Sequence, residues 1–158
     1  VRYVFGGSQE KMRISSKVDK EKVRRPDGKK LKKKEREAAY AFVQEVKNQL
    51  DAYLNPLFSE KAVAKAKMTT SGDALVLESS NVVTPGDSVV IRYSLPGRIP
   101  ETAAITTTVG ESPVSLEVEF GTLEYGPNYP ARSITTATWQ GFQLEITAEN
   151  SDFEQVRR

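Results

Sequence analysis

Two glutamates placed two positions apart, Glu117 and Glu119, come closest in this sequence to a catalytic pattern. In an extended strand they share a face, and paired carboxylates can transfer protons or bind a hard cation. More often such a pair is a solvated strand face. The 158 residues include no His and no Cys, which removes the commonest general base, thiolate nucleophiles and Cys-ligated zinc. We therefore expect no enzyme, no metal site and no cofactor.

The elements that would position this pair lie in one stretch. Residues 116–122 alternate apolar and other side chains, which predicts a strand with the glutamates on one face. Gly121 permits close backbone approach near the end of this strand. A proline-braced loop follows, and residues 131–140 contain neither Pro nor Gly, which favours a helix. The stretch therefore predicts a strand, a stiff loop and a helix, with Glu119 and Arg132 at the two ends of the loop.

This stretch also carries a family resemblance. Glu119-Phe120-Gly121-Thr122, then seven residues, then Pro130-Ala131-Arg132 resembles the signature of the minor tail or tail-completion proteins of long-tailed bacteriophages. Ser133 and Ile134 stand where that family usually has Pro and Phe. The wider order of a helix, a Ser-Gly-Asp-Ala-Leu segment at 71–75, strands and then the signature extends the resemblance over residues 35–148.

The resemblance implies a structural virion protein of the phage neck. Such a protein would complete the tail or join head and tail, as a homo-oligomeric ring between head connector and tail tube. Implied partners are other copies of the chain, six in this family, head-connector proteins, tail-tube or tail-terminator proteins and packaged DNA, with no membrane. The implied location is the virion neck, after assembly in the host cytoplasm. The implied signature or subunit-interface residues are Glu119, Phe120, Gly121, Thr122, Pro130 and Arg132.

Charge divides the chain into two unequal parts. The net charge of +2 combines +8 over residues 1–38 with −6 over residues 39–158, an asymmetry typical of an interaction tail. The densest positive run is Lys29, Lys30, Lys32, Lys33 and Lys34. Three interpretations stay open: a DNA-phosphate contact, which makes a nucleic-acid-binding module the alternative function, a solvated arm or helix start, or contact with the acidic body of a neighbouring subunit. No aromatic residue interleaves with the lysines, so base stacking is not expected.

Hydrophobic patterning predicts an α+β fold. Apolar residues at steps of three and four predict a long amphipathic helix at 35–54, and Ser59 can cap a second, shorter helix to about Met68. β-branched runs between turns predict a small, mainly antiparallel sheet, with strands at about 74–83, 88–93, 103–109 and 114–120. The C-terminal part is ambiguous, with a helix at about 130–140 and a strand at about 141–148 as the favoured interpretation.

We accordingly divide the sequence into three parts. Residues 1–34 are expected to be a basic, extended or flexible arm, in which Tyr3 and Phe5 are either a frayed end or an anchor on a neighbour. Residues 35–148 are expected to be a single α+β domain, with Trp139 as a core or interface anchor. Residues 149–158 are expected to be a polar tail. No apolar run approaches the roughly 20 residues of a membrane-spanning helix.

Overall fold

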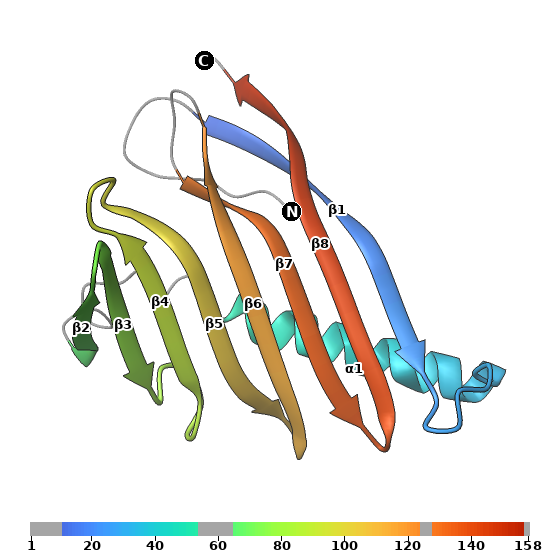
Figure 1. The fold of residues 1–158 in the computed structure, drawn as a ribbon. Helices are drawn as coiled ribbons and strands as arrows, with labels where there is room; N and C mark the ends of the chain where they lie inside the picture. Colours follow the sequence, from blue (N-terminus) through green and yellow to red (C-terminus); the bar gives the residue numbers. More distant parts are fainter. Residues whose placement is uncertain (1–10, 54–64, 124–127, 157–158) are drawn as a thin grey trace.

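One eight-stranded antiparallel sheet dominates the computed structural model, which describes residues 11–53, 65–123 and 128–156 (Figure 1). The strand order is β1-β8-β7-β6-β5-β4-β3-β2, so β1 and β2 are the two edges. Strands β2 to β8 follow one another as a meander, and β1 joins at the far edge beside β8. The strands are β1 (Lys11–Arg24), β2 (Lys67–Ser71), β3 (Ala74–Ser80), β4 (Ser88–Ser94), β5 (Ile99–Val109), β6 (Ser112–Thr122), β7 (Asn128–Trp139) and β8 (Phe142–Val156).

Tight turns set the register of the meander. Gln140 and Gly141 connect β7 to β8 with φ values of 48° and 78°, and two successive positive φ angles match the right-handed twist of a hairpin. Gly110, with φ 60°, serves the same purpose between β5 and β6. Because neighbouring strands are joined so closely, side chains that alternate along each strand line up into rows across the sheet.

The helix α1 (Lys33–Asp51) crosses one face of the sheet (Figure 1). Its buried side chains Phe42, Val43 and Val46 form one core cluster with inward-facing residues of β5 to β8. The Trp139 ring stacks on Phe42 with ring centroids 5.3 Å apart, so the prediction of Trp139 as a core anchor is confirmed. The sheet residues of this cluster are Val109, Val114, Ala137, Leu144 and Ile146.

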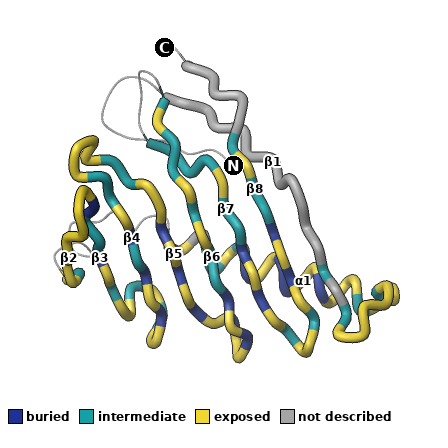
Figure 2. The backbone as a smooth tube through the Cα atoms, in the orientation of Figure 1, coloured by how far each residue is buried: buried dark blue, intermediate teal, exposed yellow. Residues whose placement is uncertain are grey.

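A second core cluster forms around Tyr53, just beyond the end of α1. Tyr53 is fully buried and packs with the inward-facing side chains of β3, β4 and β5. Figure 2 shows the buried residues gathered along the part of the strands that α1 crosses. Burial of this apolar stripe is the main stabilising term of the fold, because each fully buried aliphatic side chain contributes about 1.5–3 kcal/mol. The partners of Tyr53 in this cluster are Leu77, Val89, Ile91, Ala103 and Ile105.

The predicted α+β fold, with two helices on a small sheet and a possible C-terminal helix, is wrong. α1 is the single helix of four or more residues in the described chain, and the sheet is its largest element. Residues 130–139 of the stretch expected as a helix lie in β7, and Gln140 belongs to the turn that follows. Thr135, Ala137 and Trp139 alternate toward the core there, and the β-branched threonines of this stretch favour strand over helix. The shorter helix expected at 59–68 falls mostly outside the described residues, and its last two positions, Lys67 and Met68, begin β2.

The arm and the tail are also corrected. Residues 11–24 of the basic arm form β1, and residues 149–156 of the expected tail form the end of β8. The two segments pair with one another as strands. The local sequence of either segment does not reveal this pairing, because the paired positions are more than a hundred residues apart in the chain. The sequence expectations for residues 1–10 lie outside the described residues. The strands expected at about 74–83, 88–93, 103–109 and 114–120 are confirmed as β3, β4, β5 and β6.

Candidate assembly surface

The signature segment forms a β-hairpin rather than a strand, loop and helix. Gly121 near the end of β6 lies directly opposite Tyr129 on β7. A Cβ built on Gly121 would meet the Tyr129 ring at 2.8 Å, so glycine is needed here for the tyrosine ring to lie over the backbone. Beyond this pair, the Thr122 hydroxyl donates to Asn128 Oδ1 over 2.8 Å. The loop end of the hairpin is therefore held by the Tyr129 ring over Gly121 and by the hydrogen bond between Thr122 and Asn128.

Pro130 lies beside a bulge near the loop end of this hairpin. Glu119 pairs with Arg132, whereas the next residue of β6, Phe120, pairs with Pro130. Ala131 is thus an extra residue on β7. A bulge interrupts the ladder of hydrogen bonds, which is why a residue without an N–H is tolerated there. The Asn150 side chain on β8 donates to the Pro130 carbonyl and ties the bulge to the next strand.

The register brings Glu119, Arg132 and Glu149 into one row across β6, β7 and β8. Arg132 Nε lies 3.8 Å from Glu149 Oε1, and the two side chains are 45% and 59% exposed. The row lies on the face opposite α1, because Val118, next to Glu119, packs toward the core. An exposed ion pair stabilises a fold by about 0–1 kcal/mol, so this row contributes little to holding the sheet together.

A shallow hollow of about 250 Å³ lies beside this row. Its apolar part comes from Val90 on β4, Ala104 on β5 and Ile134 on β7, and Glu117 of β6 lies between the last two in the register. Glu117 and Glu119 stand on the same face, and Arg132 closes one side. Glu117 and Glu119 are thus neighbours on an open strand surface, in the arrangement of a solvated face.

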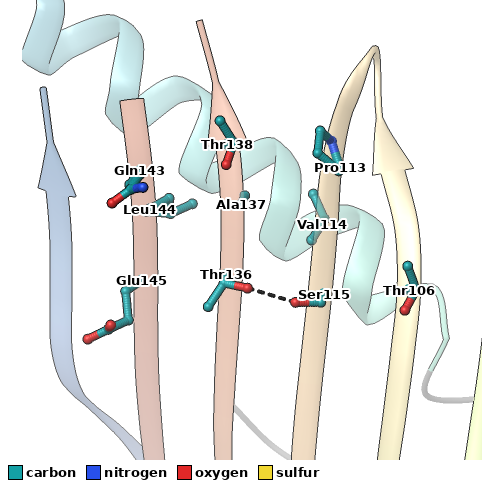
Figure 3. A pocket seen from close by; sticks show the side chains of 10 residues that line it. All are labelled: Thr106, Pro113, Val114, Ser115, Thr136, Ala137, Thr138, Gln143, Leu144 and Glu145. Atoms are coloured by element: carbon teal, nitrogen blue, oxygen red, sulfur yellow. Dashed lines mark hydrogen bonds between the residues drawn. The ribbon is translucent and has the colours of Figure 1, made fainter. Parts of the chain in front are cut away.

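A larger hollow of about 410 Å³ lies on the same face over β5 to β8 (Figure 3). Thr106, Ser115, Thr136 and Glu145 form one row across it by strand register. The Ser115 and Thr136 hydroxyl oxygens lie 2.7 Å apart and are hydrogen-bonded to one another. The hollow therefore has a mixed lining of hydroxyl-bearing and apolar side chains, and its described residues form no nucleophile–base pair.

The five lysines of the positive run lie between β1 and α1 and in the first turn of α1. All five are exposed. Arg25 forms ion pairs with the nearby Asp27 and Glu35, at 3.2 Å each. Glu35 also accepts a hydrogen bond from the backbone N–H of Lys32 over 2.7 Å. Lys29 Nζ reaches Asp27 only at 4.0 Å. The fold thus presents Lys29, Lys30, Lys32, Lys33 and Lys34 together as a cationic corner of the molecule.

Sequence patterning identified Thr84–Asp87 only as a turn and missed its role in the core. Asp87 is 2% exposed, and its carboxylate accepts the backbone N–H groups of Val82, Val83 and Thr84 over 2.7–2.8 Å. The Tyr53 hydroxyl donates to it over 2.8 Å and also lies 2.9 Å from Thr107 Oγ1. The turn composition is the local signal of this cluster, whereas its side-chain partners Tyr53 and Thr107 come from distant parts of the chain.

Burial alone raises the pKa of the Asp87 carboxyl, but the hydrogen bonds from Thr84, Val83, Val82 and Tyr53 outweigh burial and hold the pKa below its ordinary value. The pKa of Tyr53 is raised, chiefly by burial and further by the neighbouring carboxylate. Both groups are therefore locked in their ordinary protonation states at neutral pH. The cluster ties the end of α1 to the β3–β4 loop, which is a structural role.

No group of three or more His, Cys, Asp or Glu residues in the described ranges is placed to hold a metal ion. Within the described residues, no helix is long and apolar enough to cross a membrane. In comparisons with protein families, with curated proteins and with solved structures, none matches this chain.

Proposed function

We propose that the chain is a structural subunit of a phage neck, which self-associates into a ring between head connector and tail tube. The observation that carries the proposal is the open sheet. Among the described elements only α1 covers it, on one face, while the other face and the free sides of β1 and β2 bear no further element (Figure 1). An open sheet with two different edges suits head-to-tail contacts between copies, which close into a ring.

The signature residues support the same proposal in a revised form. A helix was expected at residues 131–140 after the signature, but the segment is a hairpin, so the support comes from the surface that the residues form. Arg132, between two acidic neighbours in register and beside an apolar hollow, offers a mixed polar and apolar patch typical of an interface rim. The chain also lacks His and Cys throughout, which fits a subunit with an assembly role.

Electron microscopy of the purified full-length chain tests this proposal. We expect closed rings of one diameter, with six subunits as the family resemblance implies. Replacement of Arg132 by Ala should reduce the fraction of rings. A field of single small particles at every protein concentration would contradict the proposal.

The cationic corner favours DNA-backbone binding as a second candidate function. Phosphate neutralisation needs only exposed, closely placed cations, and the five lysines before and in the first turn of α1 meet this condition. Deletion of residues 1–34 is unsuitable as a test because it would remove β1 from the sheet. Replacement of all five lysines by Gln keeps the strand. A chain that binds duplex DNA should lose affinity in this variant, and its log affinity should fall with log salt by about 0.9 per phosphate contacted.

The control replaces two exposed cations elsewhere, Lys67 and Arg92, by Gln, and removes two positive charges where the five-lysine variant removes five. Both are paired with acids on the sheet, Lys67 with Glu78 and Arg92 with Glu101. DNA binding that is lost in both variants to the same degree would reflect net charge alone and would contradict a role for the cationic corner.

A further inference from the structure

β1 is attached to the described sheet through one neighbouring strand. It is the last strand of the sheet, and it pairs with β8 from Lys11 opposite Val156 to Arg24 opposite Gln143 (Figure 1). Near its end, Val23 packs against the core cluster beneath α1. Without β1, the other seven strands would keep their pairing, and β8 would become an open edge.

Charge makes the two strands complementary. β1 carries six basic and two acidic residues, whereas β8 carries four acidic residues and no basic one. Opposite charges directly across a strand pair attract, and like charges repel. An open β8 edge would therefore reject a second β8 and accept a basic strand such as β1. The directly opposed pairs of opposite charge are Arg13 with Glu154, Lys17 with Glu149 and Lys22 with Glu145.

The connection from β1 to α1 is short and polar. Its turn is closed by a hydrogen bond of 3.0 Å from the Gly28 N–H to the Arg25 carbonyl, and Arg25 is paired with Asp27 and Glu35. Residues 26–30 are exposed, so straightening this connection would uncover little apolar surface. The β1–β8 ladder has register irregularities at two places, Arg13/Ser15 and Val18/Lys20.

We propose that β1 is an exchangeable strand, and that in the assembled form β1 of one subunit pairs with β8 of the next copy. This proposal rests on the proposed function, because it supposes that the chain self-associates. The exchanged strand keeps the same backbone pairing, with the same oppositely charged residues opposed in the register, as in a single chain, so exchange has a low energetic cost. Each subunit donates one strand and accepts one, which is the head-to-tail contact that a ring needs.

Cysteine cross-linking tests the exchange directly, since the sequence has no native Cys. Lys22 and Glu145 are register partners, and facing residues of antiparallel strands have Cα atoms about 4.5–5.5 Å apart, within the range of a disulfide. One full-length chain carries only Lys22→Cys and a second carries only Glu145→Cys. The two are mixed in denaturant, refolded together and oxidised. The proposal predicts a covalent heterodimer, seen as a product of twice the chain mass that disappears on reduction.

The control mixture pairs Lys22→Cys with Thr108→Cys. Thr108 is exposed but lies on β5, three strands from β8 in the sheet order, so this mixture should give only background cross-linking. A chain with both Lys22→Cys and Glu145→Cys reports the alternative. If it closes its disulfide within single chains, and the mixed chains give no more heterodimer than the control, strand exchange is overturned.

The native mass of the unmodified chain separates the two proposals. Oligomers without the heterodimer disulfide would overturn strand exchange and leave self-association through another surface in place. A monomer that closes its disulfide only within the chain would overturn both. Absence of any disulfide in the doubly substituted chain would contradict the β1–β8 register and with it the exchange.

Discussion

The Tyr53 hydroxyl donates a hydrogen bond of 2.8 Å to Asp87, and both residues are almost fully buried. Tyr53 follows α1, and Asp87 closes the loop between β3 and β4. This single contact therefore joins the end of the helix to a loop of the sheet. It also places a carboxylate among donors that stabilise its charge, which makes the stability of the fold sensitive to acid.

Asp87→Asn should lower the free energy of unfolding by about 1–3 kcal/mol at pH 7, since buried backbone donors would lose a charged acceptor. Because the pKa of Asp87 in the folded chain lies below its unfolded value of about 3.9, the stabilisation is present above about pH 4 and is lost as the pH falls through the folded pKa. Urea unfolding from pH 7 down to about pH 2 should show the two proteins converging in acid.

The exposed Asp73 in the β2–β3 turn provides the control for this prediction. Asp73→Asn should change the unfolding free energy at pH 7 by no more than about 0.5 kcal/mol. A difference between the parent chain and Asp87→Asn that stays constant down to pH 2 would show that the Asp87 charge does not stabilise the fold.

Val46→Asp should prevent stable folding. Val46 is fully buried in α1 against the sheet, and an unpaired carboxylate there costs several kcal/mol, a large share of the total stability of a small domain. Circular dichroism should show loss of the cooperative thermal transition. Gln44→Asp on the exposed side of the same helix is the control, and equal melting of the two variants would mean that this stripe of α1 is not core.

Gly121→Ala should destabilise the hairpin by about 1–3 kcal/mol, because the new Cβ would overlap the Tyr129 ring unless the ring moves. Removal of that ring should relieve the overlap. In a double-mutant cycle with Tyr129→Ala, the effect of Gly121→Ala should therefore become much smaller. Strictly additive unfolding free energies would show that the ring does not lie over Gly121.

Part of this architecture was predictable from local patterns. Alternation and β-branched runs located β3, β4, β5 and β6, and helical spacing indicated apolar positions such as Val46 that are buried in α1. The strand β7 was missed because residues 131–140 contain neither Pro nor Gly, which also suits a helix. The decisive alternation of Thr135, Ala137 and Trp139 toward the core includes a threonine, so hydrophobicity alone did not reveal it.

The long-range features could not be predicted from local patterns. The sequence suggested that Glu119 and Arg132 stand at the two ends of a loop, but the bulge at Ala131 and the row with Glu149 depend on strand register. The pairing of β1 with β8 joins the two ends of the described chain. The buried hydrogen bond between Tyr53 and Asp87 spans 34 positions. Each depends on how distant segments meet in the sheet.

Arg132→Ala should impair assembly more than folding. The ion pair with Glu149 is exposed, so its loss should change the unfolding free energy by no more than about 1 kcal/mol. Arg92→Ala is a matched control, because Arg92 forms an exposed pair with Glu101 at 3.0 Å on the same sheet. Thermal melting and sedimentation of the two variants should differ only in assembly, and equal losses of both properties would remove a specific role for Arg132.

Self-association is the central claim, and the native mass of the purified full-length chain tests it most directly. The account predicts one dominant closed oligomer, with six copies as the family resemblance implies, over a range of protein concentrations. A single species at the mass of one chain, unchanged as the protein concentration is raised, would contradict it.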